Sequence, residues 1–308
     1  MKNRKLIVLI GITIIISMCS VIMAKTIQQL VFTFVGILIM MALSYLNPQF
    51  LLRYAEIFSL FIFFIGSIVG YNNRLETRSS YLLNCGELKI RMYTFMLLNL
   101  PFLGIWLYKK IKQHGTDFWV LKFLSIFTIE MVCVRLILRS EKIKIWLMSL
   151  VGKTESEYIY NILKRAQLNY RIWDESVFFE DILYYLPEAE DTLLLTYYIS
   201  QYGIVIGCCT FIALIILFIK IFNDFTECKF QEAVVGNLCV AVLFSLMILN
   251  VLVNFRLLPF LSHRTFLPFF TQNFGENIYS YILMGIILSV YRYNLNGKRE
   301  NSTMIAEN

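Results

Sequence analysis

The chain has 308 residues, of which 58% are hydrophobic and 16% are charged, and its formal net charge is +7. A soluble globular domain carries roughly 25% charged residues, so this composition excludes an ordinary water-soluble protein. The charges gather in clusters between long apolar runs. The basic excess therefore indicates the cytoplasmic face of a membrane protein rather than a nucleic-acid surface.

The apolar runs predict about eight membrane-spanning helices, because about 20 apolar residues suffice to cross the hydrocarbon layer. The first run follows Lys2, Arg4 and Lys5, and further spans follow at once, which favours an uncleaved span over a signal peptide. The predicted fold class is an all-α, polytopic transmembrane bundle that forms one domain over residues 1–308. The expected spans are residues 6–24, 27–45, 54–71, 92–108, 118–138, 194–222, 232–253 and 276–292.

Basic residues in short loops predict the orientation of the bundle. Clusters of Lys and Arg occur at the N-terminus, in the 109–117 loop and in the tail after Tyr291, and eight spans place all three on one side. Both termini are therefore expected in the cytoplasm. The 139–193 loop is then extracytoplasmic, although Arg139, Lys142 and Lys144 at its start disagree with the rule.

An acidic segment leads into the sixth predicted span. Pro187 suits the first turn of a helix, and Glu188, Glu190 and Asp191 follow it. One interpretation is a helix start at which the macrodipole favours negative charge. The other is a general base or a ligand for a divalent metal ion at the membrane surface. No other cofactor is evident, because the cysteines and histidines show no metal-ligand spacing.

Ionisable residues at two further places are candidates for function. Arg256 and Arg264 lie in the last outer loop, where they are either solvated or bind a phosphate-bearing headgroup by charge-assisted hydrogen bonds. Glu130 and Arg135 lie within the fifth predicted span, where ionisable groups usually face a partner or a wet cavity.

Three ordered blocks of the sequence resemble FtsW/RodA/SpoVE proteins, the SEDS family of peptidoglycan glycosyltransferases. The first block begins with Leu186-Pro187-Glu188-Ala189 and runs without gaps to Gly203. The second covers residues 28–55, and the third runs from Asn250 through Leu257-Leu258-Pro259 and Leu267-Pro268-Phe269 to Val290. Together the three blocks cover about half of the chain.

The chain also departs from the pattern of this family. The family's catalytic aspartate falls on Thr192, with Asp191 one residue early, and a Glu-Glu pair falls on Ser200-Gln201. A shift of one helical residue turns a side chain by about 100°. Several loop motifs are missing, and the usual ten spans are reduced by two. The resemblance therefore supports the fold more strongly than the activity.

The resemblance implies polymerisation of lipid II glycan at the outer surface of the membrane. Asp191 or Glu188 would be the base, and Arg256 and Arg264 would hold the pyrophosphate, so Glu188, Asp191 and Arg264 are expected to converge on one outward-opening cavity. A second hypothesis is a non-catalytic relative that serves as a scaffold for a class B penicillin-binding protein or holds the lipid substrate. A third hypothesis, a transporter or lipid flippase, depends only on the polytopic form and on Glu130 and Arg135. No nucleic-acid partner is expected.

Overall fold

A computed structural model gives the fold of the chain as a bundle of membrane helices. The structure describes residues 2–76, 81–85, 88–91, 97–114, 155–176, 193–226, 232–255, 257 and 266–306. The predicted fifth span, residues 118–138, lies outside this described part of the chain, as do Glu130 and Arg135. The predicted helical fold class is confirmed. The elements are α1 (Lys2–Ala24), α2 (Ile27–Ser44), α3 (Pro48–Glu76), β1 (Tyr81–Cys85), β2 (Leu88–Arg91), α5 (Asn99–His114), α8 (Glu155–Leu168), α11 (Leu194–Tyr202), α12 (Ile204–Thr226), α13 (Ala233–Asn254) and α14 (Phe274–Ala306).

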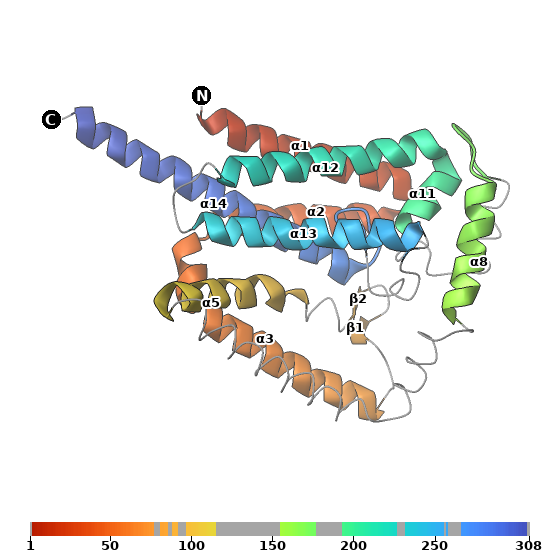
Figure 1. Ribbon diagram of the computed structural model, residues 1–308, viewed down its shortest axis with the longest axis horizontal. Coiled ribbons are helices and arrows are strands. Elements are labelled where there is room, and N and C mark those ends of the chain that lie inside the picture. The colour runs from red at the N-terminus through yellow and green to blue at the C-terminus, as the bar shows by residue number, and fades with distance from the viewer. Residues whose placement is uncertain are drawn as a thin grey trace.

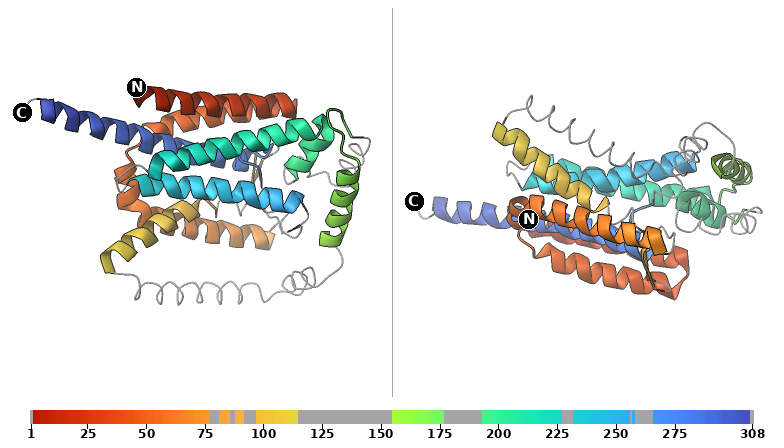
Figure 2. Two further views of the ribbon diagram at one scale, coloured as in Figure 1. Left: turned by 45° about the horizontal axis from the view of Figure 1, so that its top comes forward. Right: turned by 90° about the horizontal axis from the view of Figure 1, so that it is seen from below.

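The long helices run roughly alongside one another, and both termini lie at the same end of the bundle (Figure 1). At the opposite end, called the α8 end here, α8 crosses the direction of the long helices and α11 lies beside it (Figures 1 and 2). Within the described residues, α1, α2, α12 and α13 each contain a stretch long and apolar enough to cross a membrane. The shared position of the termini agrees with an even number of crossings.

Capping residues explain where two of the predicted helices begin. The hydroxyl of Thr26 accepts a hydrogen bond from the N–H of Gln29 at 3.3 Å, which satisfies a free donor in the first turn of α2. The side chain of Asn47 accepts from the N–H of Gln49 at 2.9 Å, and Pro48 occupies the first position of α3. These local signals place a tight turn between α2 and α3.

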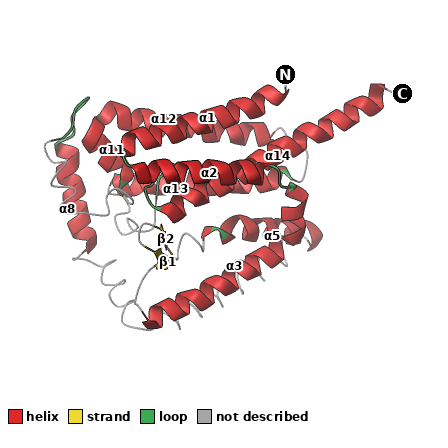
Figure 3. Ribbon diagram, turned by 180° about the vertical axis from the view of Figure 1, so that it is seen from behind, coloured by secondary structure: helices red, strands yellow, loops and turns green. Residues whose placement is uncertain are grey.

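The fourth predicted span and the loop after it differ from the structure. The span was expected at residues 92–108, but α5 runs from Asn99 to His114 and therefore contains Lys109, Lys110 and Lys112. Lysine is a good helix former, so an apolar window alone ends the helix too early. Two-stranded pairing of β1 and β2 was not predicted, and it adds a small antiparallel hairpin at the α8 end (Figure 3).

The sixth predicted span, residues 194–222, is divided into α11 and α12 at Gly203. Gly203 has φ 90° and ψ 165°, a region that is essentially limited to glycine. The strap, defined here as residues 169–176, lies against this break. Its carbonyl groups at Arg171 and Ile172 accept hydrogen bonds from the N–H groups of Ile204 and Val205 at 2.9 and 3.3 Å. The strap therefore replaces intrahelical partners that the start of α12 lacks.

The centre of the bundle is the close pair formed by α2 and α14. A Cβ atom on Gly36 would overlap the ring of Tyr281, and one on Gly285 would lie 2.9 Å from the carbonyl oxygen of Met40. Small residues allow this approach between membrane helices. Around the pair lies a buried core that includes Met40, Leu283 and Ile287.

The predicted orientation can be tested by labelling Ser156→Cys, in α8, in a cysteine-free background. We expect labelling from outside intact cells, because the Lys and Arg clusters at the other end are expected in the cytoplasm. Lys112→Cys, at the end of α5, should react only after lysis. The reverse pattern at both positions would contradict the orientation.

Candidate functional site

The four residues predicted to carry chemistry, Glu188, Asp191, Arg256 and Arg264, lie outside the described residues. Their roles and their convergence on one cavity stay predictions. The described residues closest to them in sequence are Leu193, Phe255, Leu257 and Phe266. The described segments that adjoin them include α11, the end of α13 and the turn before α14.

The first of these segments, α11, is joined to the end of α13 by a buried asparagine. The N–H of Thr196 donates to the side-chain oxygen of Asn254 at 2.8 Å. The side-chain amide of Asn254 donates in turn to the carbonyl oxygen of Asn250 at 2.7 Å. Asn254 is only 3% exposed and Asn250 is fully buried, so these bonds form without competition from water. They hold the start of α11 against the last turn of α13.

The same helix is joined to the turn that begins at Phe266. The hydroxyl of Tyr198 donates to the carbonyl oxygen of Phe270 at 3.1 Å, and the two rings meet edge to face with centroids 6.0 Å apart. Tyr198 is fully buried. The turn itself is tight, since Phe269 has a positive φ of 70° and packs its ring against Tyr281. The described segments next to all four predicted residues thus meet at the α8 end.

A buried carboxylate at the start of α14 was not identified from the sequence. The side chain of Glu276 is fully buried, and its Oε2 accepts from the hydroxyl of Thr271 at 2.9 Å. The side chain of Asn273 accepts from the N–H of Glu276 at 3.4 Å, and the hydroxyl of Thr271 also accepts from the N–H of Asn273 at 3.2 Å. Asn273 with Glu276 three residues later resembles a capping box, and this spacing is the signal that could have revealed the site.

The geometry gives Glu276 a structural role, because its carboxylate closes the turn between Phe266 and α14. Removing a buried acceptor leaves its donor unsatisfied, which costs about 1–3 kcal/mol, more when the acceptor is charged.

We therefore expect Glu276→Ala to lower the free energy of unfolding by about 1–3 kcal/mol. Glu276→Gln should cost less, because its amide oxygen can still accept from Thr271. The measurement is reversible unfolding in mixed detergent micelles. Equal losses in the two variants would show that the hydrogen bond from Thr271 contributes nothing.

Unpaired polar atoms mark one face of α11. The hydroxyl groups of Thr196 and Ser200 are buried and have no hydrogen-bond partner among the described residues, and they lie one helical turn apart. The side-chain oxygen of Gln201 is also buried and has no partner within this described part of the chain. Unsatisfied buried polar groups are rare and need a partner such as water or a ligand. Ser200 and Gln201 therefore offer neutral hydrogen-bonding groups on α11.

Within the described residues, no group of three His, Cys, Asp or Glu side chains is placed to hold a metal ion. Glu188 and Asp191 are not among the residues described.

No family model matches the sequence, and no curated protein is significantly similar to it. Among solved structures, the chain is similar to one from work on "structural coordination of polymerization and crosslinking by a peptidoglycan synthase complex", with a TM-score of 0.63 and 12% identity. The likeness covers 94% of this chain and 97% of the other. It shows that the two chains share one fold along nearly their whole lengths.

Proposed function

We propose that this chain is a divergent SEDS-type membrane protein of bacterial cell-wall synthesis that binds lipid II at the outer surface of the plasma membrane. The observation that carries the proposal is the fold shared with a chain of a peptidoglycan synthase complex over 94% of this chain. The ordered sequence blocks from Leu186 to Gly203 and from Asn250 to Val290 support it independently.

In the catalytic form of the proposal, Asp191 acts as the general base, with Glu188 as the alternative. The base accepts the proton of an acceptor sugar hydroxyl, whose oxygen attacks the anomeric carbon of the donor. The bond from that carbon to undecaprenyl pyrophosphate breaks, and the pyrophosphate leaves with the bonding electrons. Arg256 and Arg264 stabilise its charge by charge-assisted hydrogen bonds.

The joined segments at the α8 end support a shared site. Asp191 precedes Leu193 by two residues, Arg256 follows Phe255 directly, and Arg264 precedes Phe266 by two. Hydrogen bonds from Thr196 to Asn254 and from Tyr198 to Phe270 connect the segments to which these residues belong. A reacting group and its charge-stabilising partners need such proximity.

A specific observation favours a second candidate function, a scaffold that binds lipid II or a class B penicillin-binding protein without catalysis. Ser200 is fully buried and neutral, and Thr192 stands where the family has its aspartate. A site that has lost acidic groups but keeps unpaired hydrogen-bonding atoms retains the capacity to bind polar groups.

The deciding experiment combines purified protein with fluorescent lipid II, with and without a class B penicillin-binding protein. Glycan product supports the catalytic form. Lipid II binding or complex formation without product supports the scaffold. Absence of product, of lipid II binding and of complex formation would reject the proposal.

A further inference from the structure

The exposed face of α3 combines an arginine with an apolar strip. Arg53 is exposed, and Ile57, Leu60, Phe61 and Phe64 are 63%, 69%, 60% and 64% exposed. Spacings of three and four residues place these five side chains on one face of the helix. At a rise of about 1.5 Å per residue, the strip extends roughly 16 Å from Arg53 towards the middle of α3.

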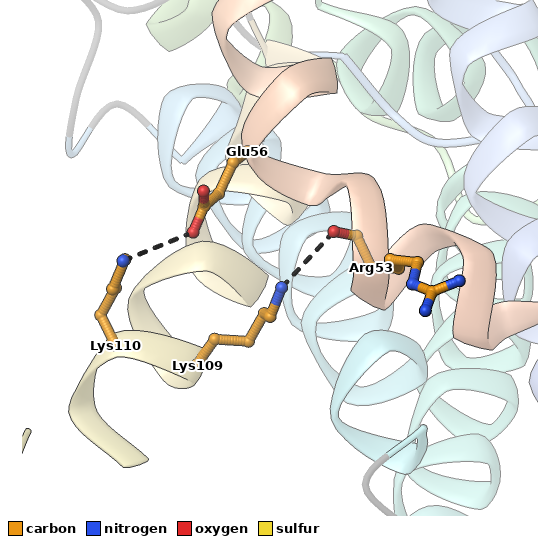
Figure 4. Close-up of polar contacts among 4 residues, drawn as sticks. All are labelled: Arg53, Glu56, Lys109 and Lys110. Atoms are coloured by element: carbon orange, nitrogen blue, oxygen red, sulfur yellow. Dashed lines mark hydrogen bonds and ion pairs between the residues drawn. The ribbon is translucent and has the colours of Figure 1, made fainter. Parts of the chain in front are cut away.

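The end of α5 adds three lysines beside Arg53. The ammonium group of Lys109 donates to the carbonyl oxygen of Arg53 at 3.5 Å, and that of Lys110 lies 3.7 Å from the carboxylate of Glu56 (Figure 4). Lys112 follows and is exposed. Glu56 is the only acidic residue of α3 before Phe64, and α5 has none. Among the described residues of α3 up to Phe64 and of α5, four cations therefore stand against one carboxylate.

The ion pair between α3 and α5 at this corner is only partly buried. The side chain of Glu56 is 43% exposed and the side chain of Lys110 is 27% exposed, so water screens their ion pair. It contributes little to the packing of α3 on α5. The guanidinium group of Arg53 points away from Lys109 (Figure 4). Arg53 precedes the residues of the apolar strip in the chain.

We propose that this corner binds an anionic glycerophospholipid of the inner leaflet. The phosphate contacts Arg53 within the positive potential of Lys109, Lys110 and Lys112, and one acyl chain lies along Ile57, Leu60, Phe61 and Phe64. Guanidinium groups favour phosphate because their donors match its oxygens. The apolar strip selects a lipid over free phosphate, since only a lipid covers both parts of the face. The placement in the inner leaflet follows the expected cytoplasmic position of the termini.

Substitutions of the positive and negative residues at this corner should change phosphatidylglycerol binding in opposite directions. A cation near an anionic lipid surface contributes about five-fold in affinity, so Arg53→Gln should weaken phosphatidylglycerol binding about five-fold. Glu56→Gln should tighten the same binding, because it removes a negative charge next to Lys110. Binding of phosphatidylcholine, whose headgroup is neutral overall, should change little in either variant.

The test is native mass spectrometry of the full chain in detergent, titrated with phosphatidylglycerol or phosphatidylcholine. Lys164→Gln, an exposed site in α8, is the control for loss of one charge elsewhere. Leu60→Asn tests the apolar strip and should weaken both lipids. Each variant is compared with the wild type only if its melting temperature is unchanged, and Lys112→Gln replaces Arg53→Gln if that variant fails this criterion. It should weaken phosphatidylglycerol binding as Arg53→Gln does.

The site would be supported if Arg53→Gln weakens binding of phosphatidylglycerol but not of phosphatidylcholine, and if Glu56→Gln tightens phosphatidylglycerol binding. Equal weakening by Arg53→Gln and Lys164→Gln would overturn it, because the lipid would then respond only to net charge. Full competition by millimolar inorganic phosphate would also overturn it, since this result would indicate an anion site without a lipid chain.

Discussion

Under the catalytic form of the proposal, Asp191→Asn is expected to lower the rate of glycan polymerisation by about 10²–10⁴, the usual loss when a general base is removed. The substitution keeps the size of the side chain and most of its hydrogen bonding, but it removes the charge that accepts a proton. The sequence predicts an exposed position for Asp191, and an exposed charge near a helix start contributes only about 0.3–1 kcal/mol, so the fold should persist. The measurement is the initial rate of product formation from labelled lipid II.

Two further variants separate the outcomes. Glu188→Gln should affect the rate less if Asp191 is the base, and Thr192→Asp introduces the aspartate that the resemblance to the SEDS family predicts at this position. Equal rates for the wild type and Asp191→Asn would show that the assigned base is wrong, even though the fold assignment would stand. A wild type that forms no product, together with an Asp191→Asn variant that still supports its partner in cells, would favour the scaffold.

Gly203→Ala is expected to lower the free energy of unfolding by about 3 kcal/mol or more. The backbone conformation of Gly203 costs other residues about 1–3 kcal/mol. A Cβ atom would also lie 2.5 Å from the carbonyl oxygen of Ile172, which is backbone and cannot turn aside as a side chain can. Moving this carbonyl would disturb its hydrogen bond from the N–H of Val205. The measurement is equilibrium unfolding in mixed micelles.

Gly11→Ala is the matched control, because a Cβ atom on Gly11 would meet nothing within 4 Å and the residue lies within α1. This change should leave stability unaltered or raise it slightly, since alanine favours the helix. If Gly203→Ala were as stable as Gly11→Ala, the strap and the glycine conformation could not be what breaks the helix.

The strap also has a consequence for the candidate site. It holds α11 from one side through the bond from the N–H of Ser176 to the carbonyl oxygen of Ser200 at 2.7 Å. Asn254 holds the other end of α11 through Thr196. Loss of either contact should therefore move the segment that follows Asp191 in the chain.

Hydropathy by itself identified seven of the segments that the structure shows as long helices or as parts of them. The hydrocarbon layer holds no water that could pair with backbone N–H and C=O groups. Each membrane segment must therefore satisfy its own backbone hydrogen bonds, and an apolar run of sufficient length is nearly always a helix. Local caps are equally visible in the sequence. Thr26 before α2 and Asn47-Pro48 at the start of α3 are examples, because the donors that they satisfy lie within three residues.

Tertiary structure alone decided the features on which the candidate site depends. The break at Gly203 needs carbonyl groups from the strap, about 30 residues earlier in the chain, and an apolar window cannot detect them. The bond between Thr196 and Asn254 joins residues 58 positions apart, and the bond between Tyr198 and Phe270 joins residues 72 apart. Hydropathy and caps are local properties, whereas these partners become neighbours only when the helices pack. The sequence therefore determined which segments are helices, and the packing determined which polar groups meet at the α8 end.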